Sequence, residues 1–209
     1  VRHIGLSEVG VATIRNAASE PVYVVGGAVR DLLLGLERAD LDLVVEGDAA
    51  ALAARLGAER REHERFATAK IEFDGHEVDI ASARSESYPH PGSLPVVRPA
   101  ATIEDDLGRR DFSVNAMAIP LAGEPRLIDP QGGRADLEAR TLRMVSAEAL
   151  ADDPLRTLRA ARIATELELE IEPETAAVVR ERAPELERVA AERIFQELKR
   201  IVAGDRPVE

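Results

Sequence analysis

Two aspartates spaced two residues apart, Asp40 and Asp42, stand at the start of a short apolar run that ends at Val45. If this run is a strand, residues two apart point to the same side, and the two carboxylates converge at one edge. Carboxylates that close repel each other unless a divalent cation lies between them. The spacing therefore indicates either an oxygen-ligated metal site or two solvated acids at the mouth of a strand, a common arrangement in a chain with 39 acidic residues.

A second apolar segment, Glu77–Ala81, carries two more acids, Glu77 and Asp79. If it pairs beside the 41–45 segment, Asp79 completes a cluster of three carboxylates. Such a cluster suits two-metal phosphoryl transfer, in which one ion activates an attacking hydroxyl and the other neutralises a triphosphate. Strand alternation places Glu77 on the same side as Asp79, so the pattern leaves both residues open as the third carboxylate.

The pair Gly26-Gly27 follows an apolar run over 22–25 and precedes Arg30. A strand, two glycines and the start of a helix place free backbone N–H groups and the positive end of the helix dipole beside an anion. Arg30 adds a guanidinium that fits phosphate oxygens. The pattern indicates a phosphate site, although Gly-Gly alone is more often a simple turn into a helix.

These residues need a scaffold of strands and helices to position them. The hydrophobic pattern predicts strands over 22–25, 41–45, 68–73, 77–81, 113–121 and 126–128, and helices over 6–18, 28–34 and 48–56. The prolines and the glycine of 88–101 predict a long irregular loop. From about residue 152 the pattern predicts helices only, over 153–168, 174–183 and 190–203. The predicted fold class is α+β, with a mixed sheet flanked by helices over 1–145 and an all-helical segment over 146–209.

The composition limits the chemistry. The sequence has no cysteine, which excludes disulfides, thiolate nucleophiles and cysteine zinc sites, and its four histidines show no ligand spacing. A catalytic metal would then have oxygen ligands, which favours Mg²⁺ or Mn²⁺. No apolar run reaches the ~20 residues that span a bilayer, and the first residues do not resemble a signal peptide, so a cytoplasmic protein without a membrane partner is expected. The net charge of −12 by itself argues against a nucleic-acid partner.

Four longer motifs, taken in chain order, resemble those of one enzyme family. They are RRDFSVNA at Arg109–Ala116, similar to RRDFT-x-NA; IDPQGG at Ile128–Gly133, similar to a DPFGG turn; DDPLR at Asp152–Arg156, similar to ED-x-x-R; and Glu192–Ile194, similar to the last family motif. Together with the Gly-Gly and Asp-x-Asp segments, they run from about residue 22 to residue 202. The chain resembles the bacterial class II CCA-adding enzymes and poly(A) polymerases of the nucleotidyltransferase superfamily.

The resemblance implies an enzyme that adds CMP and AMP from CTP and ATP to the 3′ end of tRNA without a template. It implies a nucleotidyltransferase head over 1–145 and a helical neck over 146–209. Asp40 and Asp42 would bind the metal ions, with Mg²⁺ expected and Mn²⁺ as an alternative. Asp79 would be the third carboxylate, which helps to activate the RNA 3′-hydroxyl.

The resemblance also implies a set of nucleotide-binding residues: Gly26, Gly27, Arg30, Arg110, Asp111, Asp153, Arg156, Arg159 and Arg162. Of these, the glycines and Arg30 would hold the phosphates. Arg110 and Asp111 would contact the nucleotide at its ribose. The remaining four would form the base-reading face, with Asp153 and Arg156 reading the base itself.

Helical geometry agrees with a base-reading role for residues 153–162. At about 100° per residue, one slanting stripe of a helix is formed by Asp153, Arg156, Arg159 and Arg162. A carboxylate accepts from the exocyclic amine of cytosine or adenine, and a guanidinium donates to ring acceptors. Guanine and uracil present a carbonyl at that position, so the carboxylate would repel them. The plain alternative is an i,i+3 salt bridge near the start of a helix.

Several other activities fit these motifs, and the chain departs from the family at a few positions. Within the family, a CC-only enzyme, an A-only enzyme or a poly(A) polymerase would fit; outside it, a small-molecule nucleotidyltransferase or a non-catalytic nucleotide-binding module would share the simpler motifs. Asp152 and Ser113 stand where the family has Glu and Thr. The family's body and tail domains, which hold the tRNA, are expected to be missing from this chain, and their absence would account for the acidic charge. The oligomeric state is not predicted.

Overall fold

The structure is a computed structural model of the 209-residue chain. It describes residues 7–36, 41–57, 60–63, 68–87, 89, 96–99 and 102–203. The chain divides into two compact units. The first comprises Val1–Ser85, Val97–Gly108 and Asn115–Gln131, and the second comprises Glu86–Val96, Arg109–Val114 and Gly132–Glu209.

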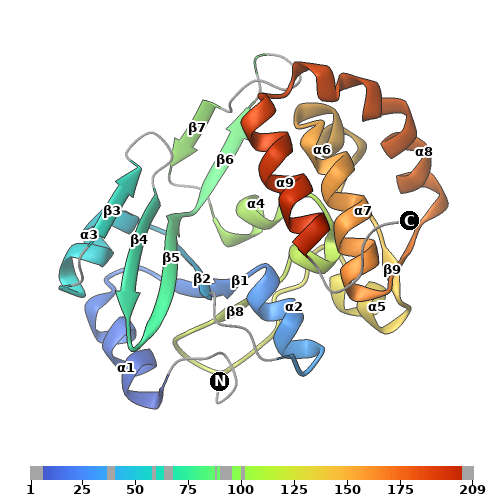
Figure 1. The fold of residues 1–209 in the computed structure, drawn as a ribbon. Coiled ribbons are helices and arrows are strands. Elements are labelled where there is room, and N and C mark those ends of the chain that lie inside the picture. The colour runs from blue at the N-terminus through green and yellow to red at the C-terminus, as the bar shows by residue number, and fades with distance from the viewer. Residues whose placement is uncertain are drawn as a thin grey trace. The chain divides into compact units, whose positions relative to one another are not determined.

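A mixed six-stranded sheet forms the centre of the first unit (Figure 1), in the order β3-β4-β5-β2-β1-β8. Its strands are β1 (Val22–Val25), β2 (Leu41–Val45), β3 (Arg60–His63), β4 (Thr68–Phe73), β5 (His76–Ser82) and β8 (Ala118–Pro120). β2 and β5 are parallel, and the other neighbours are antiparallel. The strands predicted over 22–25, 41–45, 68–73 and 77–81 are confirmed.

The two faces of this sheet differ in polarity because the side chains alternate along each strand. Leu43 of β2 and Ile80 of β5 are register partners and are fully buried. Helix α3 (Ala49–Arg55) packs on β4 and β5, and its Ala49 N–H donates to Ser82 Oγ at 3.1 Å. On the opposite face Asp42, Glu77 and Asp79 are exposed, whereas Val44, on the same side of β2 as Asp42, is buried.

Three further helices belong to the first unit: α1 (Glu8–Ala17), α2 (Gly27–Leu33) and α4 (Ile103–Gly108). The strand predicted over 113–121 is partly wrong, since Ser113–Asn115 is a 3₁₀ turn and only 118–120 are β8. Of the strand predicted over 126–128, Ile128 alone forms a bridge, to Ala118.

The segment predicted as a long loop contains a strand. β6 (Arg84–Ser87) and β7 (Val96–Pro99) form a separate two-stranded sheet, so the prediction of irregular structure over 88–101 is wrong at 96–99. A proline is tolerated at the end of an edge strand, where its missing N–H costs no ladder hydrogen bond. Most of the rest of 88–101 lies outside the described residues.

The second unit is largely helical. Its helices are α5 (Gly133–Glu138), α6 (Ala147–Asp152), α7 (Leu155–Leu167), α8 (Pro173–Arg182), the 3₁₀ helix η3 (Ala183–Arg188) and α9 (Ala191–Ala203). The three helices predicted beyond residue 152 are confirmed. The all-helical prediction for 146–209 is nevertheless wrong at one point, because β10 (Glu170–Ile171) pairs in parallel with β9 (Thr141–Leu142). Glu168, at a φ of 54°, ends α7 and turns the chain toward this pairing.

The RRDFSVNA motif explains why the compact units differ from the division predicted at residue 145. Phe112 forms a β-bridge with Met144, and Ser113 N–H donates to the Arg143 carbonyl at 2.9 Å. Val145 N–H donates to the Asp111 carbonyl at 3.0 Å. These contacts join 109–114 to the helical unit.

Helix α9 has two contrasting sides. Its Glu197 is buried at 4% exposure, while Phe195, Leu198 and Val202 are 63%, 44% and 78% exposed. Among the described residues, no helix is long and apolar enough to cross a membrane.

Candidate active site

The first group of predicted residues lies on β2 and β5. Asp42 and Asp79 are direct register partners of these parallel strands, and both are exposed on the polar face of the sheet. Neighbouring strands lie about 4.8 Å apart, so the two carboxylates are adjacent. The pairing of the two strands, on which the cluster of carboxylates was conditional, is present. Asp40 lies outside the described residues, and within the described part of the chain no cluster of three acidic or histidine ligands is found.

A lysine that the sequence analysis missed lies in the same row. Lys70 of β4 is the register partner of Asp79, and its Nζ lies 2.8 Å from Glu77 Oε1 and 3.5 Å from Asp79 Oδ2. The hydrogen bond to Glu77 is the main cause that raises the pKa of Lys70. The signal was present in the sequence: the two-residue turn Asp74-Gly75, with φ positive at both residues, is the preferred hairpin connection and fixes this register.

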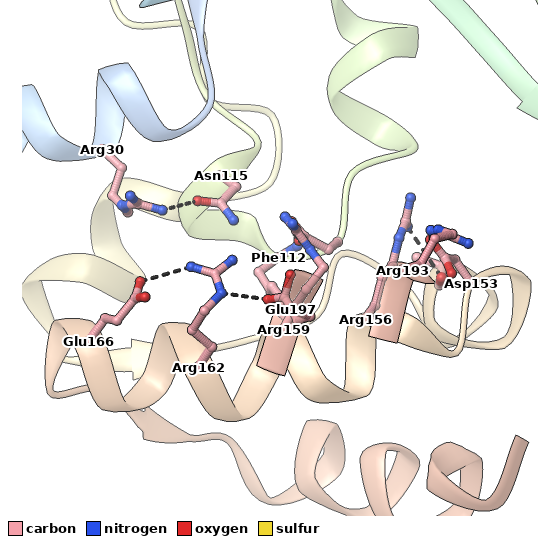
Figure 2. Close-up of polar contacts among 12 residues, drawn as sticks. Arg30, Phe112, Asn115, Asp153, Arg156, Arg159, Arg162, Glu166, Arg193 and Glu197 are labelled. Carbon is pink, nitrogen blue, oxygen red and sulfur yellow. Dashed lines mark hydrogen bonds and ion pairs between the residues drawn. The ribbon is translucent and has the colours of Figure 1, made fainter. Parts of the chain in front are cut away.

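Arg30 is held in place by two side chains. Its Nη1 donates to Asn115 Oδ1 at 2.6 Å (Figure 2). Its Nε donates to Asp31 Oδ1 at 2.8 Å, and only 8% of its side chain is exposed. Gly26 precedes α2 with a φ of 66° and a ψ of −130°, which only glycine adopts readily. A Cβ on Gly27 would come within 3.4 Å of Arg30 Nη2. That distance is an ordinary van der Waals contact, so the backbone requirement for glycine lies at Gly26.

Asn115 was not predicted as a site residue. It ends the 3₁₀ turn of the RRDFSVNA motif, 85 positions from Arg30, and it is buried at 7% exposure. In the sequence, its position within the RRDFSVNA motif was the signal that could have identified it as a site residue. The contact ties the Gly-Gly segment to the RRDFSVNA motif within the first unit.

Asp111 and Arg159, both predicted to bind nucleotide, form an ion pair in the second unit. Arg159 donates to Asp111 Oδ2 from Nε at 2.8 Å and from Nη2 at 2.5 Å. Asp111 is 6% exposed on its side chain and is the largest cause that raises the pKa of Arg159. Asp111 Oδ1 accepts from the Phe112 N–H at 2.8 Å, and Arg110 beside it is half-buried.

Asp153 and Arg156, predicted to read the base, are both buried at the start of α7. Asp153 Oδ1 accepts from the Leu155 N–H at 3.3 Å, and its Oδ2 accepts from Arg193 Nη2 of α9 at 2.7 Å (Figure 2). Arg156 Nη1 donates to the Ala149 carbonyl at 3.2 Å. Asp153 and Arg156 therefore each bind another group, whereas the simpler alternative reading was a salt bridge between the two at i,i+3.

Arg162, the last residue of the predicted stripe, lies in an ion-pair network between helices. Its Nε donates to Glu197 Oε1 of α9 at 2.5 Å, and its Nη1 donates to Glu166 Oε2 at 2.9 Å (Figure 2). The side chains of Arg162 and Glu197 are only 12% and 4% exposed. These contacts fix α9 against α7, and the predicted part of Arg162 in nucleotide binding stays a prediction.

A mixed sheet with acids on its open face and a following helical unit is the head-and-neck architecture of a nucleotidyltransferase, and the fold agrees with solved structures of that class. Residues 22–143 match the family described as "Poly A polymerase head domain", and residues 168–209 match "Probable RNA and SrmB-binding site of polymerase A". The first match covers more than half of the chain. The chain belongs to the poly(A) polymerase head-domain family, as its motifs predicted.

Curated relatives of the chain include three kinds of enzyme. It is 42% identical over 198 residues to an A-adding tRNA nucleotidyltransferase of Halalkalibacterium halodurans, which covers 90% of this chain and 46% of the relative. It is 43% identical over 202 residues to a CC-adding tRNA nucleotidyltransferase of Deinococcus radiodurans, covering 92% and 53%. It is 44% identical over 193 residues to a multifunctional CCA protein of Thioalkalivibrio sulfidiphilus, covering 88% and 46%. The chain thus spans about half the length of these relatives.

Solved structures give the same result for the fold. A CCA-adding enzyme in apo form II superposes with a TM-score of 0.86 at 36% identity, covering 97% of this chain and 51% of that one. The Thermotoga maritima CCA-adding enzyme complexed with tRNA-CCA superposes with a TM-score of 0.79 at 37% identity, covering 94% and 46%. The predicted fold class, a mixed sheet flanked by helices and followed by a neck, is confirmed.

Proposed function

We propose that this chain is the catalytic part of a template-independent tRNA 3′-end nucleotidyltransferase of the cytoplasm, which adds CMP and AMP from CTP and ATP. The observation that carries the proposal is the register of Asp42 beside Asp79, on the open face of a sheet that belongs to the poly(A) polymerase head-domain family. Relatives named as tRNA nucleotidyltransferases, and similar structures described with tRNA, CTP and ATP, support tRNA and these nucleotides as the partners.

A divalent cation fits the residues on that face. Enzymes of the nucleotidyltransferase family generally depend on such ions, and Mg²⁺ and Mn²⁺ prefer carboxylate oxygens. Asp42 and Asp79 supply these from adjacent strands, and Asp40 is proposed as a further ligand from its place in the Asp-x-Asp motif. When bound, the ions lower the pKa of the attacking hydroxyl and neutralise the triphosphate. Mg²⁺ is the proposed ion, with Mn²⁺ able to replace it.

The phosphates of the incoming nucleotide are assigned to Gly26, Gly27 and Arg30. Asn115 and Asp31 hold the Arg30 guanidinium in one orientation, so little conformational entropy is lost when it binds an anion. Arg110 and Asp111 are assigned to the ribose. The Arg159 ion pair fixes the Asp111 carboxylate for that contact.

The base is assigned to Asp153 and Arg156, with Arg159 and Arg162 extending the same face of α7. A carboxylate held in a buried site can accept from the amine of cytosine or adenine, and it meets an unfavourable carbonyl in uracil or guanine. Each carboxylate oxygen has two lone pairs, so Asp153 can keep Arg193 and accept a further hydrogen bond. Selection of C and A without a template follows from this chemistry.

The test is incorporation of labelled CTP, ATP, GTP and UTP into tRNA that lacks its 3′ end, in the presence of Mg²⁺. We expect addition of C, A or both, no addition of G or U, and loss of addition in Asp42→Asn. Glu124→Gln, which removes an exposed charge on the segment that follows β8, is the matched control and keeps activity. A chain that binds neither CTP nor ATP would contradict the proposal.

The length of the product decides among the members of the family. The A-adding, CC-adding and CCA relatives are 42%, 43% and 44% identical to the chain, so similarity does not choose between them. One added A, two added C residues, CCA or a long A tract would identify the four activities. Transfer of a nucleotide to an aminoglycoside but not to tRNA would instead identify a small-molecule enzyme, and nucleotide binding that is indifferent to Asp42→Asn would identify a non-catalytic module.

A further inference from the structure

Three charged residues form one row across the open face of the sheet. Lys70 on β4 is the register partner of Asp79 on β5, which is itself the register partner of Asp42 on β2. Register partners on neighbouring strands project to the same side, at a spacing of about 4.8 Å between strands. The row therefore places an ammonium group beside the carboxylates to which the metal ion is assigned.

Lys70 contacts its two acidic neighbours at different distances. Its Nζ lies 2.8 Å from Glu77 Oε1, a hydrogen-bonded ion pair, and 3.5 Å from Asp79 Oδ2, a longer contact. Glu77 is the register partner of Glu72 on β4, and it lies two residues along β5 from Asp79. Asp79 therefore belongs to the row that contains Asp42, and Glu77 does not. All three charged groups are 40–57% exposed on their side chains and can rearrange.

We propose that Lys70 is a positioning residue that binds Glu77 and leaves Asp79 as the third carboxylate, and that its charge sets how tightly the site binds a divalent cation. This inference rests on the proposed function. Strand alternation alone left Glu77 and Asp79 equivalent as the third carboxylate. They differ because Lys70 forms its shorter ion pair with Glu77, whereas Asp79 is the register partner of Asp42.

The sign of the effect follows from charge. Without a metal ion, Asp42 and Asp79 repel each other, and the Lys70 ammonium offsets part of that repulsion. A divalent cation at the carboxylates would in turn be repelled by the ammonium a few ångströms away. Removing the charge of Lys70 should therefore tighten metal binding. Since these groups are exposed, the expected change is about fivefold in the dissociation constant, equivalent to about 1 kcal/mol.

The experiment is a titration with Mn²⁺ alone, in which electron paramagnetic resonance measures the free ion, without nucleotide or RNA. Lys70→Met should bind Mn²⁺ about fivefold more tightly than the original chain at low salt, and the difference should shrink at 1 M salt. Lys70→Arg, which keeps the charge, is the matched control and should bind as the original chain does. Asp79→Asn, which removes a ligand, should weaken binding more than Glu77→Gln does.

The outcomes separate the two levels of the argument. If Asp42→Asn weakens Mn²⁺ binding but Lys70→Met leaves it unchanged or weaker, the role of Lys70 is overturned and the proposed metal site stands. If Glu77→Gln costs more affinity than Asp79→Asn, the assignment of the third carboxylate is overturned. If the chain binds no Mn²⁺, or Asp42→Asn changes nothing, the metal site itself fails and the role of Lys70 fails with it. Circular dichroism of each variant verifies that the sheet is intact.

Discussion

Replacing Arg193 by methionine tests the base-reading assignment most directly, because Arg193 touches Asp153 without belonging to the predicted nucleotide-binding set. The substitution removes a charge-assisted hydrogen bond of 2.7 Å and leaves one oxygen of a carboxylate that is only 13% exposed without this donor. Such bonds contribute about 1.5–3 kcal/mol, and the 34% exposure of Arg193 reduces the expected loss to about 1–2 kcal/mol. For a chain of this size the melting temperature should fall by roughly 2–8 °C.

Selectivity should change along with stability. Asp153 would keep only its hydrogen bond from the Leu155 N–H, at 3.3 Å, so its carboxylate could rotate away from the position that meets the base amine. We expect kcat/KM for CTP to fall by about tenfold or more, with a smaller fall for UTP, so that the preference between the two narrows. Competition between labelled CTP and UTP measures that ratio.

Arg188→Met is the matched control, because Arg188 is 55% exposed and lies 3.8 Å from Glu185. It should leave both the melting temperature and the CTP preference unchanged. The reasoning is refuted if Arg193→Met melts at a lower temperature but selects CTP as before, since Arg193 would then have a structural part only. Equal effects of the two substitutions would refute it as well.

Three further predictions concern the first unit. Gly26→Ala should lower the free energy of unfolding, measured by denaturant titration, by about 1–3 kcal/mol, because Gly26 has a φ of 66° with a ψ of −130°. Gly108→Ala, at a helical position with open space around it, should cause no loss. Equal losses in the two variants would contradict the strain argument. Asn115→Ala should weaken CTP binding in equilibrium dialysis by about tenfold, because Arg30 loses its 2.6 Å acceptor; an unchanged affinity would show that Arg30 needs no such support. Burial is the largest cause that raises the pKa of Tyr23 above 10.0, and the charge of Glu46 is the next, so its phenolate absorbance should appear at a higher pH than that of a free tyrosine. The free energy of unfolding should fall as pH rises through the folded-state pKa. Tyr23→Phe should remove this high-pH component of the titration.

Local periodicity predicted the parts of the fold and site that depend on neighbouring residues. The alternation of 41–45 and 77–81 predicted two acid-bearing strands, and the structure shows that these strands are adjacent, with Asp42 beside Asp79. The two-residue turn Asp74-Gly75, with positive φ at both residues, fixes the register of its hairpin. Counting back from this turn would have predicted that Lys70 lies opposite Asp79.

The parts that were missed depend on contacts between distant positions. Asn115 meets Arg30 across 85 residues and Arg193 meets Asp153 across 40, and no periodicity reports such pairs. β10 has two residues, too few for an alternating pattern, and β7 was hidden by the prolines around it. Both strands exist because tertiary pairing outweighs local propensity.

The alternation of the two compact units along the chain has a consequence for how the protein can be divided. The backbone passes between them after residues 85, 96, 108, 114 and 131, so neither unit is a continuous piece of polypeptide. A fragment ending at residue 145 would keep Phe112 and Met144 but lose Arg159, the partner of the buried Asp111 carboxylate. Cutting the gene between the predicted domains would not give two independently folding products. We expect the RRDFSVNA segment, which is hydrogen-bonded to residues 143 and 145, to be among the last to exchange its amide hydrogens.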